Sequence, residues 1–411
     1  MIRLSYKYRL KPSAEQVTTL EKQLRLCRWA YNTLLEHSFN ERKAGRGTPT
    51  HEALTYLIPA MKAMKSELSN VFSQVLQNVA KRVRSGFEGY WARKRAGLKA
   101  HLPRFRGEDR YDSLTYPQFG FRLKDGVLCL SKIGDVRIVQ HRPVEGKVKT
   151  LTVTRGRAGK WYAVFSCEVE AKPIRNRLPA VGVDFGLNSL VALSDGTLIE
   201  APRSYRGAEE RLGRAQRRLS RKKRGSRNRE KARRRLASAC ERVANRRRDF
   251  AYKTARSIVN RYERVYVEDL NVQGMMRNRR LSKSLGDAGW GLLRNALTYM
   301  AERSEGVTAF VNPRGTSQTC SGCGAYVEKS LSVRVHRCPG CGLTIDRDVN
   351  AALNVLKRGL GIGLERAEYT PVGEVTATQL SEAGQVASVS QEDHLLEVGS
   401  SHSSFGKGEN S

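Results

Sequence analysis

The sequence lacks any feature of a membrane-bound or secreted protein. No run of about 18 consecutive apolar residues occurs, which is the length that a membrane-spanning helix needs. The first residues, Met1 to Tyr6, alternate apolar and polar side chains and do not contain the apolar centre of a secretory signal. We therefore expect a cytoplasmic protein.

Several motifs of common enzyme classes are also absent. The chain has no GxGxxG fingerprint, no Walker A loop and no Ser-His-Asp ordering, so hydride transfer, ATP hydrolysis and acyl transfer have no support. It shows no His-x-His motif with a nucleophilic tyrosine, so a transposition step is not assigned. It also shows no helix-turn-helix signature that would read DNA bases directly.

Acidic residues are scarce compared with basic ones. The chain has 74 Lys and Arg against 40 Asp and Glu, a net charge of +34. Residues 359–411 carry a net charge of −6, so the preceding residues carry about +40. Such an excess repels itself unless a polyanion neutralises it, and we therefore expect a nucleic-acid partner.

The first part of the sequence alternates between strand-like and helical patterns. Residues 2–8 read as a strand, and residues 11–100 as helices that begin with a capping box at Ser13 and Gln16. Short strands divided by glycine-containing turns then follow, and together with the first strand they suggest a small barrel. These strands are expected near residues 119–123, 126–131, 134–139, 148–156 and 160–170.

The second part begins with three strands over residues 180–200 and continues into a strongly basic stretch. Residues 203–249 hold 20 Lys or Arg and five acidic residues, which indicates a helical hairpin that contacts phosphates. Residues 270–289 are polar and glycine-containing, and we expect a mobile loop there. The remaining elements are expected at residues 263–269 (strand), 291–304 (helix) and 307–311 (strand).

Four of the eight cysteines are paired in a metal-binding pattern. Cys320 and Cys323 form one C-x-x-C pair, and Cys338 and Cys341 form a second pair after a spacer of 14 residues. Four thiolates on two tight turns suit one tetrahedral, structural Zn²⁺ ion. We interpret His336 as a surface or second-shell residue. The unpaired cysteines read as free thiols: Cys27, Cys129, Cys167 and Cys240.

Three acidic positions indicate a nuclease site. Asp184 and Glu268 each end an apolar run that reads as a strand, and Asp346 and Asp348 stand at the start of a helix. Carboxylates in this order predict an RNase H-type site, in which two Mg²⁺ ions clamp the attacking and leaving oxygens of a phosphodiester. Spacing alone leaves open which of Asp346 and Asp348 binds metal and which caps the helix.

These motifs resemble the TnpB family of transposon-encoded, RNA-guided DNA nucleases. The resemblance rests on VGVDFGLNSLVALSDG, VYVEDLNVQGMMRNRRLSKSLGDAGWG, the cysteine pairs and IDRDVNAALN, and it extends in order along most of residues 1–358. It implies catalytic Asp184, Glu268 and Asp348, because the family places its third catalytic residue at the second Asp of Asp-Arg-Asp.

The resemblance also implies a multidomain α/β fold. Its parts would be a wedge β-barrel (1–10 and 101–175), a helical recognition lobe (11–100), a RuvC-like nuclease (176–313 and 344–358, with a basic hairpin at 203–262), a zinc ribbon (314–343) and a disordered acidic tail (359–411). The basic residues expected to contact nucleic acid are Arg104, Arg106, Arg217, Arg218, Arg221, Lys222, Lys223, Arg224, Arg277, Arg279 and Arg280.

The implied activity is cleavage of double-stranded DNA next to a short protein-read motif, directed by a guide RNA from the transposon's own locus. Mg²⁺, Zn²⁺ and guide RNA would be the cofactors, with one protein per RNA, in the nucleoid-associated cytoplasm of a prokaryote. Two alternatives remain open. One is a guide-directed repressor that binds without cutting, and the other is a zinc-ribbon RNA-binding protein.

Overall fold

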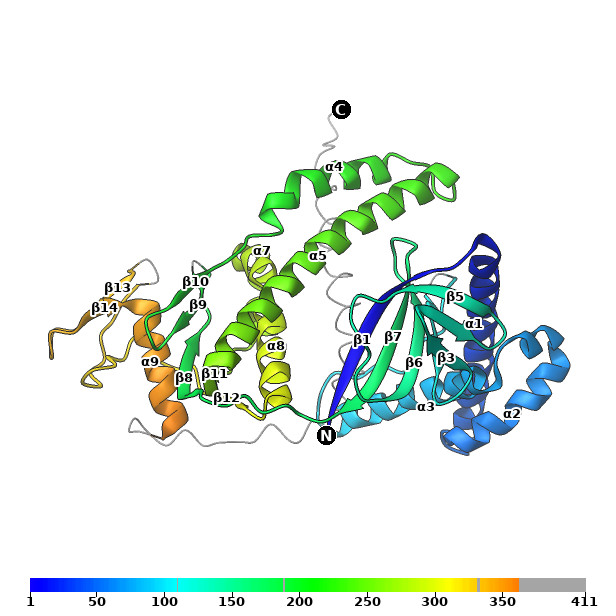
Figure 1. Cartoon of the computed structure of the whole chain (residues 1–411), viewed down its shortest axis with the longest axis horizontal. Helices are drawn as coiled ribbons and strands as arrows, with labels where there is room; N and C mark the ends of the chain where they lie inside the picture. The colour runs from blue at the N-terminus through cyan, green and yellow to red at the C-terminus, as the bar shows by residue number, and fades with distance from the viewer. Residues whose placement is uncertain (109, 188, 331–332, 362–411) are drawn as a thin grey trace, which may run out of the picture. The chain divides into compact units, whose positions relative to one another are not determined.

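The computed structural model describes residues 1–108, 110–187, 189–330 and 333–361. The chain divides into two compact units, with the boundary between Val169 and Glu170 (Figure 1). From residue 362 onward, the acidic tail expected at 359–411 lies outside the described residues. No helix in the described part of the chain is both long and apolar enough to cross a membrane.

A seven-stranded sheet forms the β part of the first unit and curves into a near-closed barrel (Figure 1). Its strand order is β2-β6-β7-β1-β5-β4-β3. The strands are β1 (Ile2–Lys11), β2 (Ser113–Tyr116), β3 (Phe121–Lys124), β4 (Val127–Leu130), β5 (Gly134–Val139), β6 (Lys147–Arg155) and β7 (Trp161–Val169).

Alternation of buried and exposed residues explains this sheet. In β1, Leu4, Tyr6, Tyr8 and Leu10 are buried while the residues between them are more exposed. Strand β2 was not expected from the sequence, although β3 and β4, which are equally short, were. Pairing with β6, as in Leu114 with Val153, gives the segment its β conformation.

The helices of the first unit lie between β1 and β2 in the sequence. They are α1 (Ala14–Lys43), α2 (His51–Met64), the 3₁₀ helix η1 (Ser66–Asn70) and α3 (Ser73–Arg95). The capping box predicted at Ser13 and Gln16 is present at the start of α1. The apolar seams of α1 and α3 pack together, and their buried residues include Leu20, Leu24, Cys27, Tyr31, Leu34, Val75, Val79, Val83 and Phe87.

A five-stranded sheet with the order β10-β9-β8-β11-β12 organises the second unit. Its strands are β8 (Leu178–Asp184), β9 (Ser189–Leu193), β10 (Leu198–Glu200), β11 (Tyr262–Glu268) and β12 (Val307–Val311). Strands β8, β11 and β12 run parallel, whereas β8, β9 and β10 form an antiparallel meander.

Helices cover both faces of this sheet (Figure 1). The helices of this unit are η2 (Arg206–Ala208), α4 (Glu209–Ser220), α5 (Arg227–Arg261), α6 (Val272–Met275), α7 (Arg279–Ala288), α8 (Trp290–Arg303) and α9 (Arg347–Leu360). Helices α5 and α8 pack on one face of the sheet and α9 packs on the other. The basic stretch forms the hairpin of α4 and α5, whose seam buries Leu236, Ala239 and Val243. On one face of the sheet, Val181, Val265 and other strand residues pack with buried residues of α5 and α8.

Helix α9 covers the opposite face at close range. Gly182 of β8 faces it, and a Cβ atom at that position would lie 2.0 Å from the backbone oxygen of Ala352. Only glycine permits this approach. Tyr266 of β11 packs on the same side with Val355 of α9. Because strand side chains alternate in direction, Asp184 and Glu268 share the face of Gly182 and Tyr266.

The prediction that residues 270–289 form a loop is wrong, because α6 and α7 occupy most of this segment. Asn278 caps the start of α7 through its side chain, and Gly289 ends the helix with a left-handed backbone. Leu285 is buried in the sheet–helix core. Asp287 is also buried and accepts hydrogen bonds from the backbone N–H groups of Tyr205 and Arg206 at 2.7 and 3.2 Å. These long-range contacts stabilise α7, although the polar composition of the segment indicates a loop.

Candidate active site and metal centre

The first two acidic positions lie at neighbouring strand ends. Asp184 is the last residue of β8, and Glu268 is the last residue of β11. The strands are parallel and pair Val183 with Val267, so the next residue of each strand is an acidic one at the same edge of the sheet. Glu268 is buried, and Asp184 is partly buried.

The third acidic residue comes from the first turn of α9. Asp348 is buried, and its Oδ2 atom would lie 3.4 Å from a Cβ atom placed on Gly186, two residues after Asp184. Its Oδ1 atom is paired with the guanidinium of Arg347 at 3.2 Å. The fold thus brings Asp348 to the loop that follows β8.

Asp346 has a different role. Its Oδ1 atom accepts hydrogen bonds from the backbone N–H groups of Asp348 and Val349 at 2.8 and 3.2 Å, so Asp346 is the N-cap of α9. The alternative that Asp348 caps the helix is therefore wrong. The Asp348 side chain does not cap the helix and is buried near Asp184.

Two of these carboxyl groups have raised pKa values, those of Asp184 and Glu268. Burial raises the pKa of Asp184 well above its ordinary value, and the charges of Glu268 and Asp348 raise it further, while Arg347 opposes the shift. Burial also raises the pKa of Glu268, against the hydrogen bond from Thr316 and the charge of Arg358. Repelling carboxylates at one buried edge form a site that favours a cation.

Neighbouring residues hold this edge in place, and no sequence motif assigned them this role. Thr316 donates a hydrogen bond of 2.5 Å from Oγ1 to Oε1 of Glu268. The indole N–H of Trp290 donates to the backbone oxygen of Gly186 at 3.1 Å, and its ring stacks on Phe185 with centroids 6.4 Å apart. Trp290, the first residue of α8, therefore contacts and stabilises the segment that follows Asp184.

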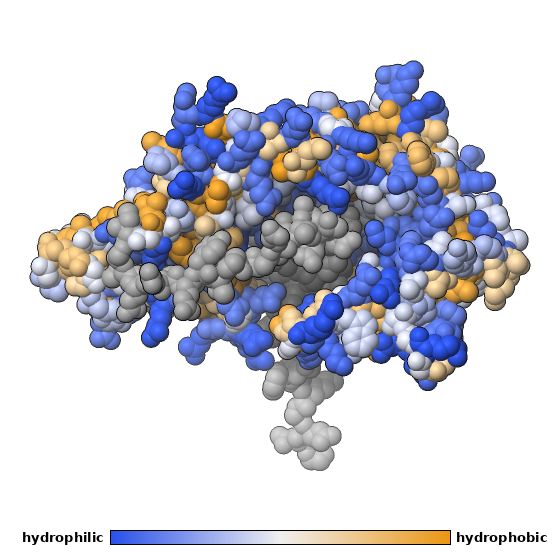
Figure 2. Space-filling view, turned by 90° about the horizontal axis from the view of Figure 1, so that it is seen from below, coloured by the Kyte–Doolittle hydropathy of each residue, from blue (hydrophilic) through white to orange (hydrophobic). Residues whose placement is uncertain are grey.

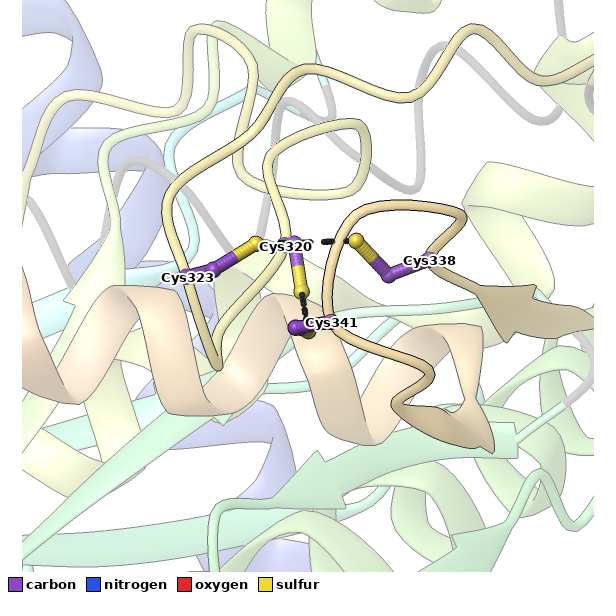
Figure 3. Close-up of side chains that lie close together, drawn as sticks. All are labelled: Cys320, Cys323, Cys338 and Cys341. Carbon is purple, nitrogen blue, oxygen red and sulfur yellow. Dashed lines mark hydrogen bonds between the residues drawn. The ribbon is translucent and has the colours of Figure 1, made fainter.

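The four paired cysteines meet at one point (Figure 3). Their sulfur atoms all lie within 4.8 Å of one another, and the Sγ atoms of Cys320 and Cys341, and of Cys323 and Cys338, are 3.6 Å apart. These separations are too long for disulfide bonds and suit tetrahedral coordination of Zn²⁺. The three carboxylates do not reach this mutual spacing, and the cysteine cluster is the one group that does in the described part of the chain.

The two cysteine turns have the same backbone pattern. The N–H of Gly324 donates to the oxygen of Cys320, and the N–H of Gly342 donates to the oxygen of Cys338, both at 2.9 Å. Backbone N–H groups of Cys341 and Gly340 together with neighbouring thiols lower the pKa of Cys338 to about 6. Such stabilisation favours the thiolate, which is the metal-binding form.

Helix α9 connects the cysteine cluster to the acidic edge. Asn350 and Asn354 are fully buried and lie on one side of the helix. Asn350 donates to the oxygen of Thr319 at 2.8 Å and accepts from the N–H of Ser321 at 2.9 Å, and Asn354 donates to the oxygens of Thr316 and Thr319. The sequence signal for this link is two asparagines four residues apart in the otherwise apolar run from Val349 to Leu356.

His336 is not on the surface, contrary to one part of our expectation. It is fully buried in β13 (Val335–Arg337), which pairs with β14 (Thr344–Asp346). Its Nδ1 atom contacts Nζ of Lys329, and burial followed by the charge of Lys329 lowers its pKa. It is not part of the group of clustered cysteine ligand atoms.

The basic residues expected to contact nucleic acid are exposed. Hydrophilic side chains cover much of the face that Figure 2 shows. In the hairpin of α4 and α5, no residue of α4 is buried. The exposed basic residues are Arg104 and Arg106 in the first unit, and Arg217, Arg218, Arg221, Lys222, Lys223, Arg224, Arg277, Arg279 and Arg280 in the second.

Three family models match the chain. Residues 164–279 match the OrfB_IS605 model, described as "Probable transposase", and residues 290–355 match the "Cas12f1-like, TNB domain". A "Helix-turn-helix domain" model matches residues 1–47, although we expected no such signature. The structure places one strand, β1, and one helix of 30 residues, α1, in that stretch.

Two curated relatives cover most of the chain. A "Putative RNA-guided DNA endonuclease" of Streptomyces pristinaespiralis is 33% identical over 370 residues, which are 87% of this chain and 90% of the relative. "Putative RNA-guided DNA endonuclease InsQ" of Escherichia coli (strain K12) is 32% identical over 376 residues, with 86% and 92% coverage.

A solved structure has a similar fold. A chain of a "Cas12f1-sgRNA-target DNA complex" aligns with a TM-score of 0.53 at 15% identity and covers 86% of this chain and 98% of that one. The fold is therefore a Cas12-like, multidomain α/β fold. With these matches and the motifs above, the chain belongs to the TnpB (OrfB_IS605) family.

Proposed function

We propose that the protein is an RNA-guided, metal-dependent DNA endonuclease encoded by a transposon. The observation that carries the proposal is the convergence of Asp184, Glu268 and Asp348 at one edge of the second unit's sheet. The names of the two curated relatives support the same activity. The strand order, an antiparallel meander followed by parallel β11 and β12, supports an RNase H-like, RuvC-type nuclease.

The donor set fits magnesium. Asp184, Glu268 and Asp348 offer only oxygen atoms, which are the ligands that a hard divalent cation prefers. Burial and mutual repulsion raise the pKa of Asp184, so a nearby cation would relieve an unfavourable arrangement of charge. We propose that these three residues hold Mg²⁺, with two ions as in other nucleases of this type.

When bound, such ions would activate water and stabilise the charge that develops on the phosphodiester. The residues of the chain supply the positioning. Thr316 orients the carboxylate of Glu268 through its 2.5 Å hydrogen bond, and Arg347 orients Asp348 through its ion pair. In-line attack would leave a 5′-phosphate and a 3′-hydroxyl.

The remaining parts of the chain would bind nucleic acid and stabilise the fold. We propose that the barrel and the helices of the first unit are the wedge unit (1–10 and 101–175) and the recognition lobe (11–100), which read a short motif beside the target. Residues 176–313 and 344–358 would form the nuclease, and residues 314–343 would form a zinc ribbon around Cys320, Cys323, Cys338 and Cys341. The exposed basic residues of the hairpin would contact phosphates.

A guide RNA would supply sequence selectivity. The charge of about +40 on residues 1–358 gives affinity for any nucleic acid, and base pairing gives discrimination. We propose that the protein acts in the prokaryotic cytoplasm, one copy per RNA transcribed from its own transposon.

The test uses protein purified with its own RNA. Cleavage of a target plasmid should require Mg²⁺, should follow changes in the guide sequence, and should stop after complete RNA removal. Asp184→Asn, Glu268→Gln and Asp348→Asn should each lose cleavage and keep nucleic-acid binding. Binding without cleavage by the unmodified protein would favour a repressor, and cleavage that ignores the guide would indicate a plain metal-dependent nuclease.

A further inference from the structure

The first unit has an aromatic hollow at the end of its helical part. Its volume is about 460 Å³, within the range of about 300–1,000 Å³ that is typical of small-molecule sites. It lies between the last turns of α1 and a segment just before β2. Its lining residues are Glu36, Phe39, Asn40, Arg42, Lys43, Leu102 and Phe105.

One aromatic ring in this hollow is held firmly but is not covered. Phe105 packs edge-on against Phe39, with centroids 5.9 Å apart and planes at 78°, yet 54% of its surface is exposed. The backbone beside it is clamped by Asn32, whose side chain accepts from the N–H of Arg106 at 2.8 Å and donates to its oxygen at 3.1 Å. A fixed, exposed ring suits stacking by a planar partner.

The surroundings of the ring are basic. Arg42 and Lys43 line the hollow, and the exposed Arg104 precedes Phe105 in the chain. Arg42 already lies over the ring of Trp91, with Cζ 5.1 Å from its centroid. An aromatic platform flanked by cations is the arrangement with which proteins bind single-stranded nucleic acid.

One acidic residue, Glu36, lines the hollow. Glu36 is exposed among the basic residues. A carboxylate repels phosphate but accepts a hydrogen bond from a ribose 2′-hydroxyl, the group that DNA lacks. Its presence therefore favours a ribonucleotide.

We propose that this hollow binds one unpaired nucleotide of RNA, with its base stacked on Phe105. Arg42, Lys43 and Arg104 contact its phosphates, and Glu36 accepts from its 2′-hydroxyl. The site deepens the proposed function, because it rests on RNA being the partner. The site adds a position at which the protein contacts an unstacked RNA base and not only the sugar-phosphate backbone.

The binding test uses full-length protein freed of RNA, with fluorescently labelled octauridylate as the probe. A matched probe is an octamer of abasic ribose phosphates, which keeps the charge and loses the bases. The intact protein should prefer octauridylate, and Phe105→Ala should reduce that preference by about 5- to 150-fold, the range expected for one stacked base. Phe105→Trp should retain it.

Phe119→Ala is the control, because Phe119 is 68% exposed in the same unit but lies outside the hollow. It should bind both probes as the intact protein does. Octadeoxyuridylate should bind more weakly than octauridylate. Glu36→Ala should reduce this difference in affinity between the RNA and DNA probes. Equal losses from Phe105→Ala and Phe119→Ala, or no base preference at all, would overturn the site. A DNA probe that binds as tightly as RNA would overturn the assignment to RNA.

Ultraviolet crosslinking of the complex purified with its own RNA gives a second readout. Irradiation followed by peptide mapping should attach an RNA base to the peptide that contains Phe105. A crosslink map without that peptide would contradict the proposal. Both readouts are independent of cleavage. If the intact protein cleaves under guidance but shows no base preference, this inference alone is refuted. If it shows the base preference but does not cleave, the nuclease function alone is refuted.

Discussion

Substitutions should show that the two aspartates of the Asp-Arg-Asp motif have different roles. We expect Asp346 to stabilise the helix and Asp348 to bind metal. Asp346 caps α9 by accepting from the N–H groups of Asp348 and Val349 at 2.8 and 3.2 Å. Asp346→Ala leaves both donors without this partner, and loss of an N-cap destabilises a protein by about 1 kcal/mol, within a range of about 0.5–2 kcal/mol. For a unit of this size, that lowers the melting temperature by about 2–4 °C.

Helix α9 should survive this loss. Val349, Ala352 and Val355 are buried against the sheet, and they hold the helix in place after its cap is removed. Asp346→Ala should therefore reduce cleavage less than about tenfold, which corresponds to about 1.4 kcal/mol. Asp346→Asn should keep both stability and activity, because asparagine caps helices as well as aspartate does.

Asp348→Asn should give the opposite result. The shape of the side chain and most of its packing are retained, so the melting temperature should change little. Cleavage should fall by more than about a hundredfold, since even indirect partners of a metal contribute about 10- to 100-fold. Thermal unfolding and plasmid cleavage in Mg²⁺ measure both quantities. If Asp346→Asn is inactive while Asp348→Asn cleaves, the assignment of roles within the motif is wrong.

Three further predictions concern other parts of the second unit. Asp184→Asn should stabilise the metal-free protein at pH 8 but not at pH 4, because the raised pKa of Asp184 makes its charged form destabilising as pH rises above its unfolded value of about 3.9. Unfolding in a chelator at both pH values checks this, and equal stability at pH 8 would contradict it. Cys338→Ser should remove one zinc ion per chain and lower stability, since structural zinc binding contributes folding free energy; elemental analysis that finds no zinc in the intact protein would refute the centre. Gly182→Ala should destabilise the fold by about 1–3 kcal/mol and weaken cleavage by displacing α9, because its Cβ atom would lie 2.0 Å from a backbone oxygen. Gly291→Ala, with nothing within 4 Å of its Cβ atom, is the control and should not destabilise, so equal losses in both variants would exclude close packing as the cause.

Local patterns in the sequence determined most of the elements that carry the site. Short apolar runs predicted β8 and β11, and the two C-x-x-C pairs predicted the cysteine cluster. These signals are local, because strand period and cysteine spacing depend only on residues near each other in the chain. They also identified Asp184 and Glu268 as strand-end carboxylates.

Tertiary structure decided what local patterns left open. Spacing did not separate Asp346 from Asp348, because either residue fits a helix start; the packing of α9 on β8 made one the cap and buried the other. Thr316 donates its hydrogen bond to Glu268, which is 48 residues away in the sequence, so no local pattern could show this pair.

The same reason explains the segments that were misread. Residues 270–289 are polar enough to resemble a loop, and they become helical because Leu285 and Asp287 find partners far away in the sequence. Strand β2 takes its β conformation from its pairing with β6, about 40 residues later in the sequence. Helix and strand formation in such segments depends on contacts between distant residues, which no local pattern in the sequence contains.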